Sequence, residues 1–109
     1  MAQVNDIMQK LISGNCDDPN ELSKDLLILS ANMYNVGQEI TKNEIKYAEK
    51  WTLDRSKYKT DKETDLALKS SEEYKNLEQS KNAYKMMLEV IRSAKKRLNV
   101  LSDNTSLHY

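Results

Sequence analysis

The residues best suited to chemistry are cations interleaved with aromatic side chains in the segment 46–59. Aromatic faces stack on unpaired bases while lysine and arginine hold the phosphates, so this composition is typical of single-stranded nucleic-acid binding. Trp51 and Tyr58 are seven residues apart and Arg55 follows Trp51 by four, so a helix places all three on one side. The candidate nucleic-acid-binding residues are Lys46, Lys50, Trp51, Arg55, Lys57, Tyr58 and Lys59.

A structural interpretation of the same segment is also open. Its aromatic residues fall where a helical hairpin would use them for packing, and its cations can pair with carboxylates of the chain. The overall charge gives no reason to expect a polyanion, because 17 basic residues balance 17 acidic ones. Oligomerisation would favour nucleic-acid binding, because a modest patch repeated around a ring becomes a continuous basic track.

Residue types that serve catalysis are sparse. The single histidine, His108, is one residue from the end of the sequence, where a general base or metal ligand would have no fixed geometry. The single cysteine, Cys16, precedes Asp17 and Asp18, whose charges oppose thiolate formation. The sequence contains no glycine-rich phosphate loop and no nucleophile elbow. We therefore expect a protein that is not an enzyme and that uses no cofactor, metal ion or small-molecule substrate.

A short first helix is expected over residues 1–14, followed by a long one over residues 19–58. Gly14 supplies the left-handed cap that ends the first helix. Asp18 can cap the second, with Pro19 at its first position and Glu21 reaching back to the cap. The short helix has one apolar stripe, formed by Val4, Ile7, Met8, Leu11 and Ile12.

A further long helix is expected over residues 62–102, with a flexible tail over residues 103–109. Its start is open, because Thr60 and Ser70 each precede a glutamate by three residues, which is the pattern of a capping box. Both long helices have apolar residues at heptad spacing, which predicts that they pack along a shared seam. The expected seam residues are Leu26, Leu29, Met33, Val36, Ile40, Leu77, Tyr84, Met87, Leu88, Ile91, Leu98 and Leu101.

These elements predict an all-α fold in a single domain over residues 1–109. The expected architecture is a long antiparallel helical hairpin with a short N-terminal helix and coiled-coil-like packing. Asn43 at a seam position would specify its register, and Gly37 would allow the close approach of a neighbour. Several apolar residues fall off the seams and need cover. The short first helix can supply part of it and a second copy the rest, so we expect a homo-oligomer. These residues are Met8, Leu27, Tyr34, Ile45, Leu53 and Val90.

The charges of such a hairpin would match. Folding about residue 60 brings the basic run from Arg92 to Arg97 alongside residues 24–29, near the acidic start of the second helix. The cations between Lys42 and Lys62 come alongside the acidic start of the last helix. Ion pairs that set the register, together with cations near a helix C-terminus, would explain these blocks without any ligand.

A cytoplasmic location and no membrane partner are expected. No apolar run approaches the roughly 18 residues of a membrane span. The N-terminus lacks the basic-then-apolar order of a signal peptide.

Several short motifs follow one another in a recognisable order. Ala31 opens the stretch A-N-M-Y, Glu44 opens E-I-K-Y-A-E-K-W, and Asp54 opens D-R-S-K-Y-K. The stretch S-S-E-E-Y ends at Tyr74, and Ile91 opens the basic sequence I-R-S-A-K-K-R. Over roughly residues 25–100 this layout resembles the small recombination-mediator proteins of tailed phages, the UvsY type.

The resemblance implies a ring-like oligomer that binds single-stranded DNA. It also implies loading of a RecA-like recombinase onto DNA occupied by a single-strand-binding protein, in the host cytoplasm if the chain is phage-encoded. The family's DNA contacts match positions around Lys50, Arg55 and Lys57, although Asp54 interrupts the family's basic–aromatic run. We expect a DNA recombination or replication accessory protein. The alternative is a helical adaptor or inhibitor that binds only protein, such as a phage anti-defence protein or an assembly subunit.

Overall fold

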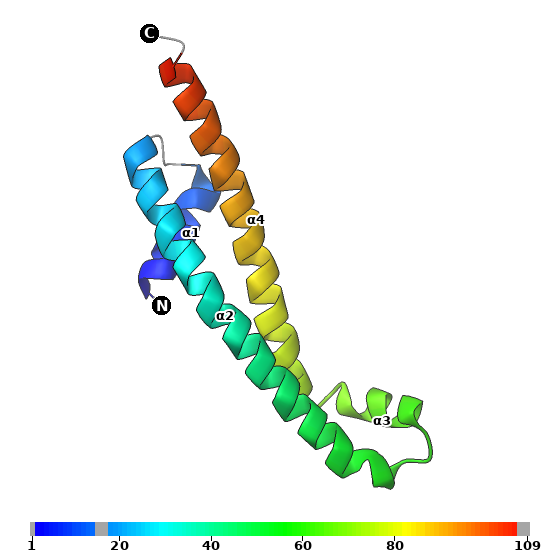
Figure 1. Cartoon of the computed structure of the whole chain (residues 1–109). Helices are drawn as coiled ribbons and strands as arrows, with labels where there is room; N and C mark the ends of the chain where they lie inside the picture. Colours follow the sequence, from blue (N-terminus) through cyan, green and yellow to red (C-terminus); the bar gives the residue numbers. More distant parts are fainter. Residues whose placement is uncertain (1, 15–17, 107–109) are drawn as a thin grey trace. The chain divides into compact units, whose positions relative to one another are not determined.

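The computed structural model describes residues 2–14 and 18–106, and this part of the chain is all-α, as predicted. The elements are α1 (Ala2–Ser13), α2 (Pro19–Asp54), the 3-10 turn η1 (Arg55–Lys57), α3 (Asp61–Leu68) and α4 (Glu72–Ser106) (Figure 1). They form two compact units, and α2 and α4 each contribute a segment to both. Unit 1 contains residues 1–34 and 85–109, and unit 2 contains residues 35–84.

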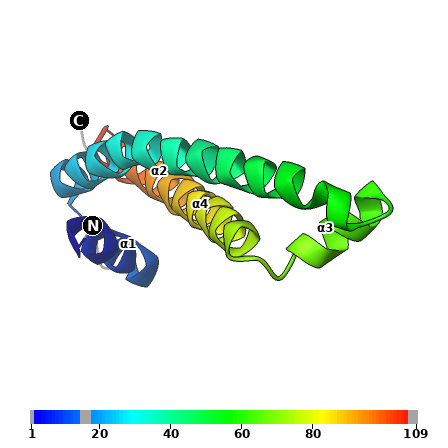
Figure 2. The ribbon, with the colours of Figure 1, turned by 90° about the horizontal axis from the view of Figure 1, so that it is seen from below.

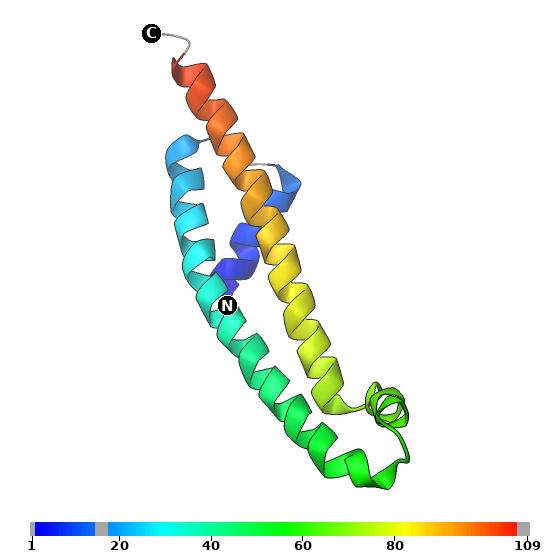
Figure 3. The same ribbon diagram turned by 45° about the vertical axis from the view of Figure 1, so that its right-hand side comes forward.

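Unit 1 is built from three helical segments. In it α1 packs against the first part of α2 and the last part of α4 (Figures 1 and 3). Lys10 ties α1 to α2, since its Nζ lies 2.7 Å from Oε1 of Glu21 and 2.6 Å from Oδ2 of Asp25. The buried apolar side chains of the unit are Val4, Ile7, Leu22, Leu26, Leu29, Met87, Ile91 and Ala94.

The boundary between α1 and α2 follows the predicted signals. Gly14 has φ +75°, the left-handed conformation that ends α1. Asp18 caps α2, because its Oδ1 accepts a 3.0 Å hydrogen bond from the backbone N–H of Asn20, and Pro19 is the first helical residue. Glu21 was expected to reach back to the cap, but its carboxylate forms an ion pair with Lys10.

Unit 2 pairs the last part of α2 with the first part of α4 in antiparallel register. Asn43 is only 7% exposed. Its Nδ2 donates to the carbonyl of Asn76 at 3.3 Å and to Oγ of Ser80 at 3.2 Å. Tyr47, one turn further along α2, packs on Tyr74, and their ring centroids are 5.7 Å apart. Asn43 thus has the contacts of a register-setting residue.

The expectation of one helix over residues 62–102 is wrong, because two helices occupy this stretch. Both candidate capping regions are used. Oγ1 of Thr60 accepts from the N–H of Glu63 at 3.1 Å and caps α3. Oγ of Ser71, rather than that of Ser70, accepts from the N–H of Tyr74 at 3.2 Å at the start of α4. The serine hydroxyl satisfies a free N–H there, so a new helix starts without glycine or proline.

The ends of the long helices also differ from the expectation. Helix α2 ends at Asp54, and the chain continues through η1 to an extended Tyr58 with φ −127° and ψ 156°. Helix α4 continues to Ser106, four residues beyond the end expected at residue 102. Residues 107–109 of the predicted tail lie outside the described part.

The expected seam residues divide by burial. Leu26, Leu29, Leu77, Met87 and Ile91 are buried. Met33, Val36, Ile40, Tyr84, Leu88, Leu98 and Leu101 are half-buried. Of the apolar residues off the seams, Met8 and Val90 are half-buried, and Leu27, Tyr34, Ile45 and Leu53 are exposed.

Gly37 does not serve the close approach that its position in the sequence suggested. A Cβ atom placed on it meets no other heavy atom within 4 Å. The packing of α2 therefore does not require glycine at this position.

Candidate nucleic-acid interface

Asp54, the last residue of α2, is the centre of the segment 46–59. Its side chain is largely buried, and each of its two carboxylate oxygens forms an ion pair with a lysine. Nζ of Lys50 lies 3.0 Å from Oδ2, and Nζ of Lys57 lies 3.1 Å from Oδ1. The hydrogen bond from Lys50, and then that from Lys57, holds the pKa of the Asp54 carboxyl below its usual range. The same bond to Asp54 raises the pKa of Lys50.

The guanidinium of Arg55 closes the turn that follows α2. Its Nε lies 2.6 Å from Oδ1 of Asp61, and its Nη1 donates to the carbonyl of Tyr58 at 2.8 Å. Asp61 is the first residue of α3, where a carboxylate is also favoured by the helix dipole. Arg55 therefore connects the end of α2 to the start of α3.

Trp51 makes a second connection between the same helices. Its indole Nε1 donates a 2.7 Å hydrogen bond to Oδ1 of Asp65, in the middle of α3. Within unit 2, α3 lies beside the end of α2 (Figure 2). Two of the predicted nucleic-acid-binding residues, Trp51 and Arg55, thus position α3.

Tyr47, another aromatic residue of this region, also packs within unit 2. Its ring is tilted by 57° against that of Tyr74. Burial, followed by the nearby Asp65 and Tyr74, raises the pKa of its hydroxyl. These are the surroundings of a packing residue rather than of an open stacking platform.

The structure therefore divides the seven predicted residues. Lys50, Trp51, Arg55 and Lys57 are bonded to carboxylates of the chain. Tyr58 is half-buried, and the side chains of Lys46 and Lys59 are exposed. Lys46 also lines a shallow polar groove of unit 2 with Glu39, Asn43, Asn76, Gln79 and Ser80.

Sequence reasoning missed the three aspartates that hold this region together, Asp54, Asp61 and Asp65. Asp54 had a signal, since it follows Lys50 by four residues and precedes Lys57 by three, the spacings of ion pairs on a helix. No sequence signal indicated the roles of Asp61 and Asp65, because α3 was not expected as a separate helix.

In unit 1 the acidic start of α2 also has a different partner from the one expected. Glu21 and Asp25, the acidic residues expected near the basic run of the last helix, are bound by Lys10 of α1. Hydrogen bonds to Asp25 and then Glu21 raise the pKa of Lys10. Glu21 and Asp25 thus pair with a cation of α1 that the hairpin did not predict.

Comparison of the chain with protein-family models, curated proteins and solved structures finds no match. The resemblance to the UvsY type therefore stays a prediction. Cys16 and His108, which were not expected to be catalytic, lie outside the described residues. Within the described ranges, no helix is long and apolar enough to cross a membrane.

Proposed function

We propose that this chain is a non-enzymatic, cytoplasmic helical adaptor that acts by binding protein, and that it binds a second copy of itself. One observation carries the proposal. In unit 2 the outer face of α2 forms a shallow groove lined by Ile45, Ala48, Glu49, Thr52 and Leu53. Ile45 is 54% exposed and Leu53 is 75% exposed. Single exposed apolar residues are ordinary, whereas neighbouring ones that line a groove are typical of an interaction surface.

The charges on this face favour a second copy as the occupant. Lys42 lies three residues before Ile45 and Glu49 lies four residues after it, so both are on the same side of α2. Both side chains are exposed. In an antiparallel pair related by a twofold axis, Lys42 of each copy can face Glu49 of the other. The face is therefore complementary to itself in charge, and this register brings Ile45 of each copy close to Ile45 of the other.

Light scattering after size-exclusion chromatography tests this proposal. The wild-type chain should show a multiple of its 12.6 kDa mass at micromolar concentration. The double variant Ile45→Glu/Leu53→Glu should be monomeric with unchanged helix content by circular dichroism, because the added charges lie on exposed positions. Leu66→Glu, on the exposed side of α3, is the matched control and should keep the wild-type mass. A monomeric wild type, or a double variant of wild-type mass, refutes the proposal.

Single-stranded DNA binding through the segment 46–59 is the second candidate function. One observation favours it. Lys50 and Lys57 share the single carboxylate of Asp54, so these three side chains together carry one net positive charge. Lys46 and Lys59 are exposed on either side of it in the sequence. The RecA-like recombinase and single-strand-binding protein implied by the resemblance would be the partners of that function.

Fluorescence anisotropy with a labelled thymidine oligonucleotide, at low and moderate salt, separates the two functions. The informative variant is Lys46→Glu/Lys59→Glu, because neither side chain holds α2 and α3 together. Arg55→Glu is less informative, since it would also break the contact with Asp61. DNA binding that the double variant abolishes supports the second candidate, and absence of binding at low salt refutes it.

A further inference from the structure

Helix α4 presents a second stripe at heptad spacing in unit 1, apart from its buried seam. Met86, Val90, Ser93, Arg97 and Val100 follow one another at intervals of four, three, four and three residues, so they share one side of the helix. Met86 is 60% exposed and Val100 is 56% exposed, while Val90 is half-buried. The spacing is that of a helix-packing surface, although its ends are open to solvent.

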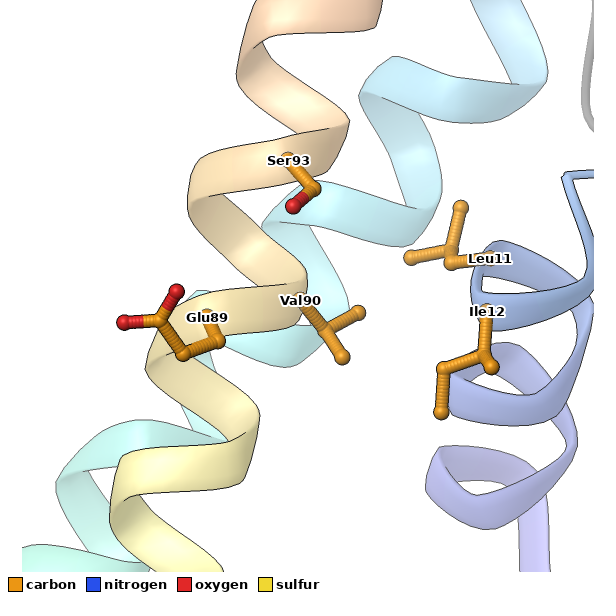
Figure 4. A pocket seen from close by; sticks show the side chains of 5 residues that line it. All are labelled: Leu11, Ile12, Glu89, Val90 and Ser93. Carbon is orange, nitrogen blue, oxygen red and sulfur yellow. The ribbon is translucent and has the colours of Figure 1, made fainter.

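A groove lies between α1 and the middle of this stripe. Leu11 and Ile12 of α1 and Glu89, Val90 and Ser93 of α4 line it together. Val90 points towards the two α1 residues, whereas Glu89 points away from them (Figure 4). Ile12 is 64% exposed, so the apolar surface of the groove remains accessible. A helix laid along the stripe would therefore contact apolar side chains from two elements of unit 1.

The row of residues next to the stripe is basic. Lys85, Glu89, Arg92 and Lys96 run beside it at intervals of four, three and four residues, and all four are exposed. The single acid of the row, Glu89, forms an ion pair with Arg92, because its Oε1 lies 3.3 Å from Nη1 of that arginine. No acidic residue occurs between residues 90 and 102 of the sequence.

Two structural explanations of these cations do not apply here. Glu21 and Asp25, the acids that the sequence places near this part of α4, are bound by Lys10. The helix dipole acts within about one turn of a helix end. Arg97 lies nine residues before Ser106, the last residue of α4. Lys85 and Lys96 of the basic row therefore lie where the dipole does not account for them, and the two acids expected near the row are bound by Lys10.

We infer that the stripe on α4, with its groove against α1, is a docking surface for an acidic amphipathic helix of a partner protein. The apolar face of that helix would lie on Met86, Val90 and Val100, and its flanking carboxylates would face Lys85 and Lys96. A nucleic acid fits less well, because residues 85–102 contain no aromatic side chain on which bases could stack. The inference rests on the proposed function in that the chain acts by binding protein, but it concerns a different surface.

Anisotropy of a fluorescein-labelled peptide of three heptads, with leucine at the core positions and glutamate at the flanking ones, tests the inference. The matched pair of variants is Lys96→Glu and Lys95→Glu, which make the same charge change at adjacent residues. Lys96 is beside the stripe, whereas Lys95, five residues after Val90, is on the opposite side of α4. Lys96→Glu should weaken binding about two- to fivefold, and Lys95→Glu by a clearly smaller factor.

Apolar contact is tested separately by Met86→Ser/Val100→Ser, which should also weaken binding of the peptide. A peptide with lysine in place of glutamate should not bind. The inference is overturned if the acidic peptide fails to bind at low salt, or if both lysine variants weaken it equally. It is also overturned if a thymidine oligonucleotide binds this surface in place of the peptide. A change of oligomeric mass in the Lys96→Glu variant would assign the surface to a second copy and overturn it too. The mass of the wild type tests the proposed function independently.

Discussion

Replacing Asn43 tests whether the register of unit 2 depends on one buried amide. The side chain is 7% exposed and makes hydrogen bonds of 3.3 Å to the Asn76 carbonyl and 3.2 Å to Oγ of Ser80. Both distances are at the long end of the normal range, so each bond should contribute about 0.5–1 kcal/mol. Their loss in Asn43→Ala should lower the free energy of unfolding by about 1–2 kcal/mol.

Alanine also favours the helix intrinsically, so the change must be measured against a matched control. Asn35→Ala makes the same replacement at an exposed position of α2 in the same unit. Relative to Asn35→Ala, the midpoint temperature of Asn43→Ala should be lower by about 4–9 °C, given the unfolding entropy of a chain of about 100 residues. Thermal unfolding followed by circular dichroism, at one protein concentration, provides the measurement.

Asn43→Leu separates the hydrogen bonds from the filling of space. A buried leucine gains about 1.5–3 kcal/mol of apolar burial, which offsets the lost bonds. Oγ of Ser80 keeps its 2.8 Å hydrogen bond to the Leu77 carbonyl. The leucine variant should therefore be at least as stable as the wild type. If Asn43→Ala melts within about 2 °C of Asn35→Ala, Asn43 does not stabilise the pairing and the reasoning fails.

Three other changes have defined outcomes. Gly37→Ala should raise the free energy of unfolding by about 0.5–1 kcal/mol in urea titration, because the added Cβ meets no atom within 4 Å. Lys10→Ala should lower it by about 1–3 kcal/mol, since Asp25 keeps a buried carboxylate without its partner, whereas exposed Lys24→Ala should change little. The pKa of Asp54 is lowered, so its stabilisation is present above the ordinary value of about 3.9 and is lost as the pH falls through the lowered one. Asp54→Asn should accordingly flatten the loss of stability below about pH 4 in thermal melts, and an unchanged acid limb would contradict this.

The all-α class and the start of α2 were predictable because they depend on local signals. Heptad spacing indicates helices whatever their partners, and Asp18 with Pro19 defines a helix start from neighbouring residues alone. The break between α3 and α4 was harder to locate. Thr60 and Ser71 both cap, and sequence alone does not show that two caps eleven residues apart are both used.

The assignment of the cations required knowledge of tertiary contacts. The sequence balances its charges, so each lysine has several carboxylates within plausible reach. The sequence does not indicate Lys10 as the partner of Glu21 and Asp25, because Lys10 belongs to another helix whose packing the heptad pattern does not define. The bonds of Trp51 and Arg55 to α3 were missed for the same reason.

The hydrogen bond between Trp51 and Asp65 gives the protein an internal optical probe. Trp51 is the single tryptophan of the sequence, and its indole N–H is bound to a carboxylate of α3. Its fluorescence emission should therefore change when α3 separates from the end of α2. Stopped-flow measurements of that emission can follow this contact during refolding or ligand binding without any added label.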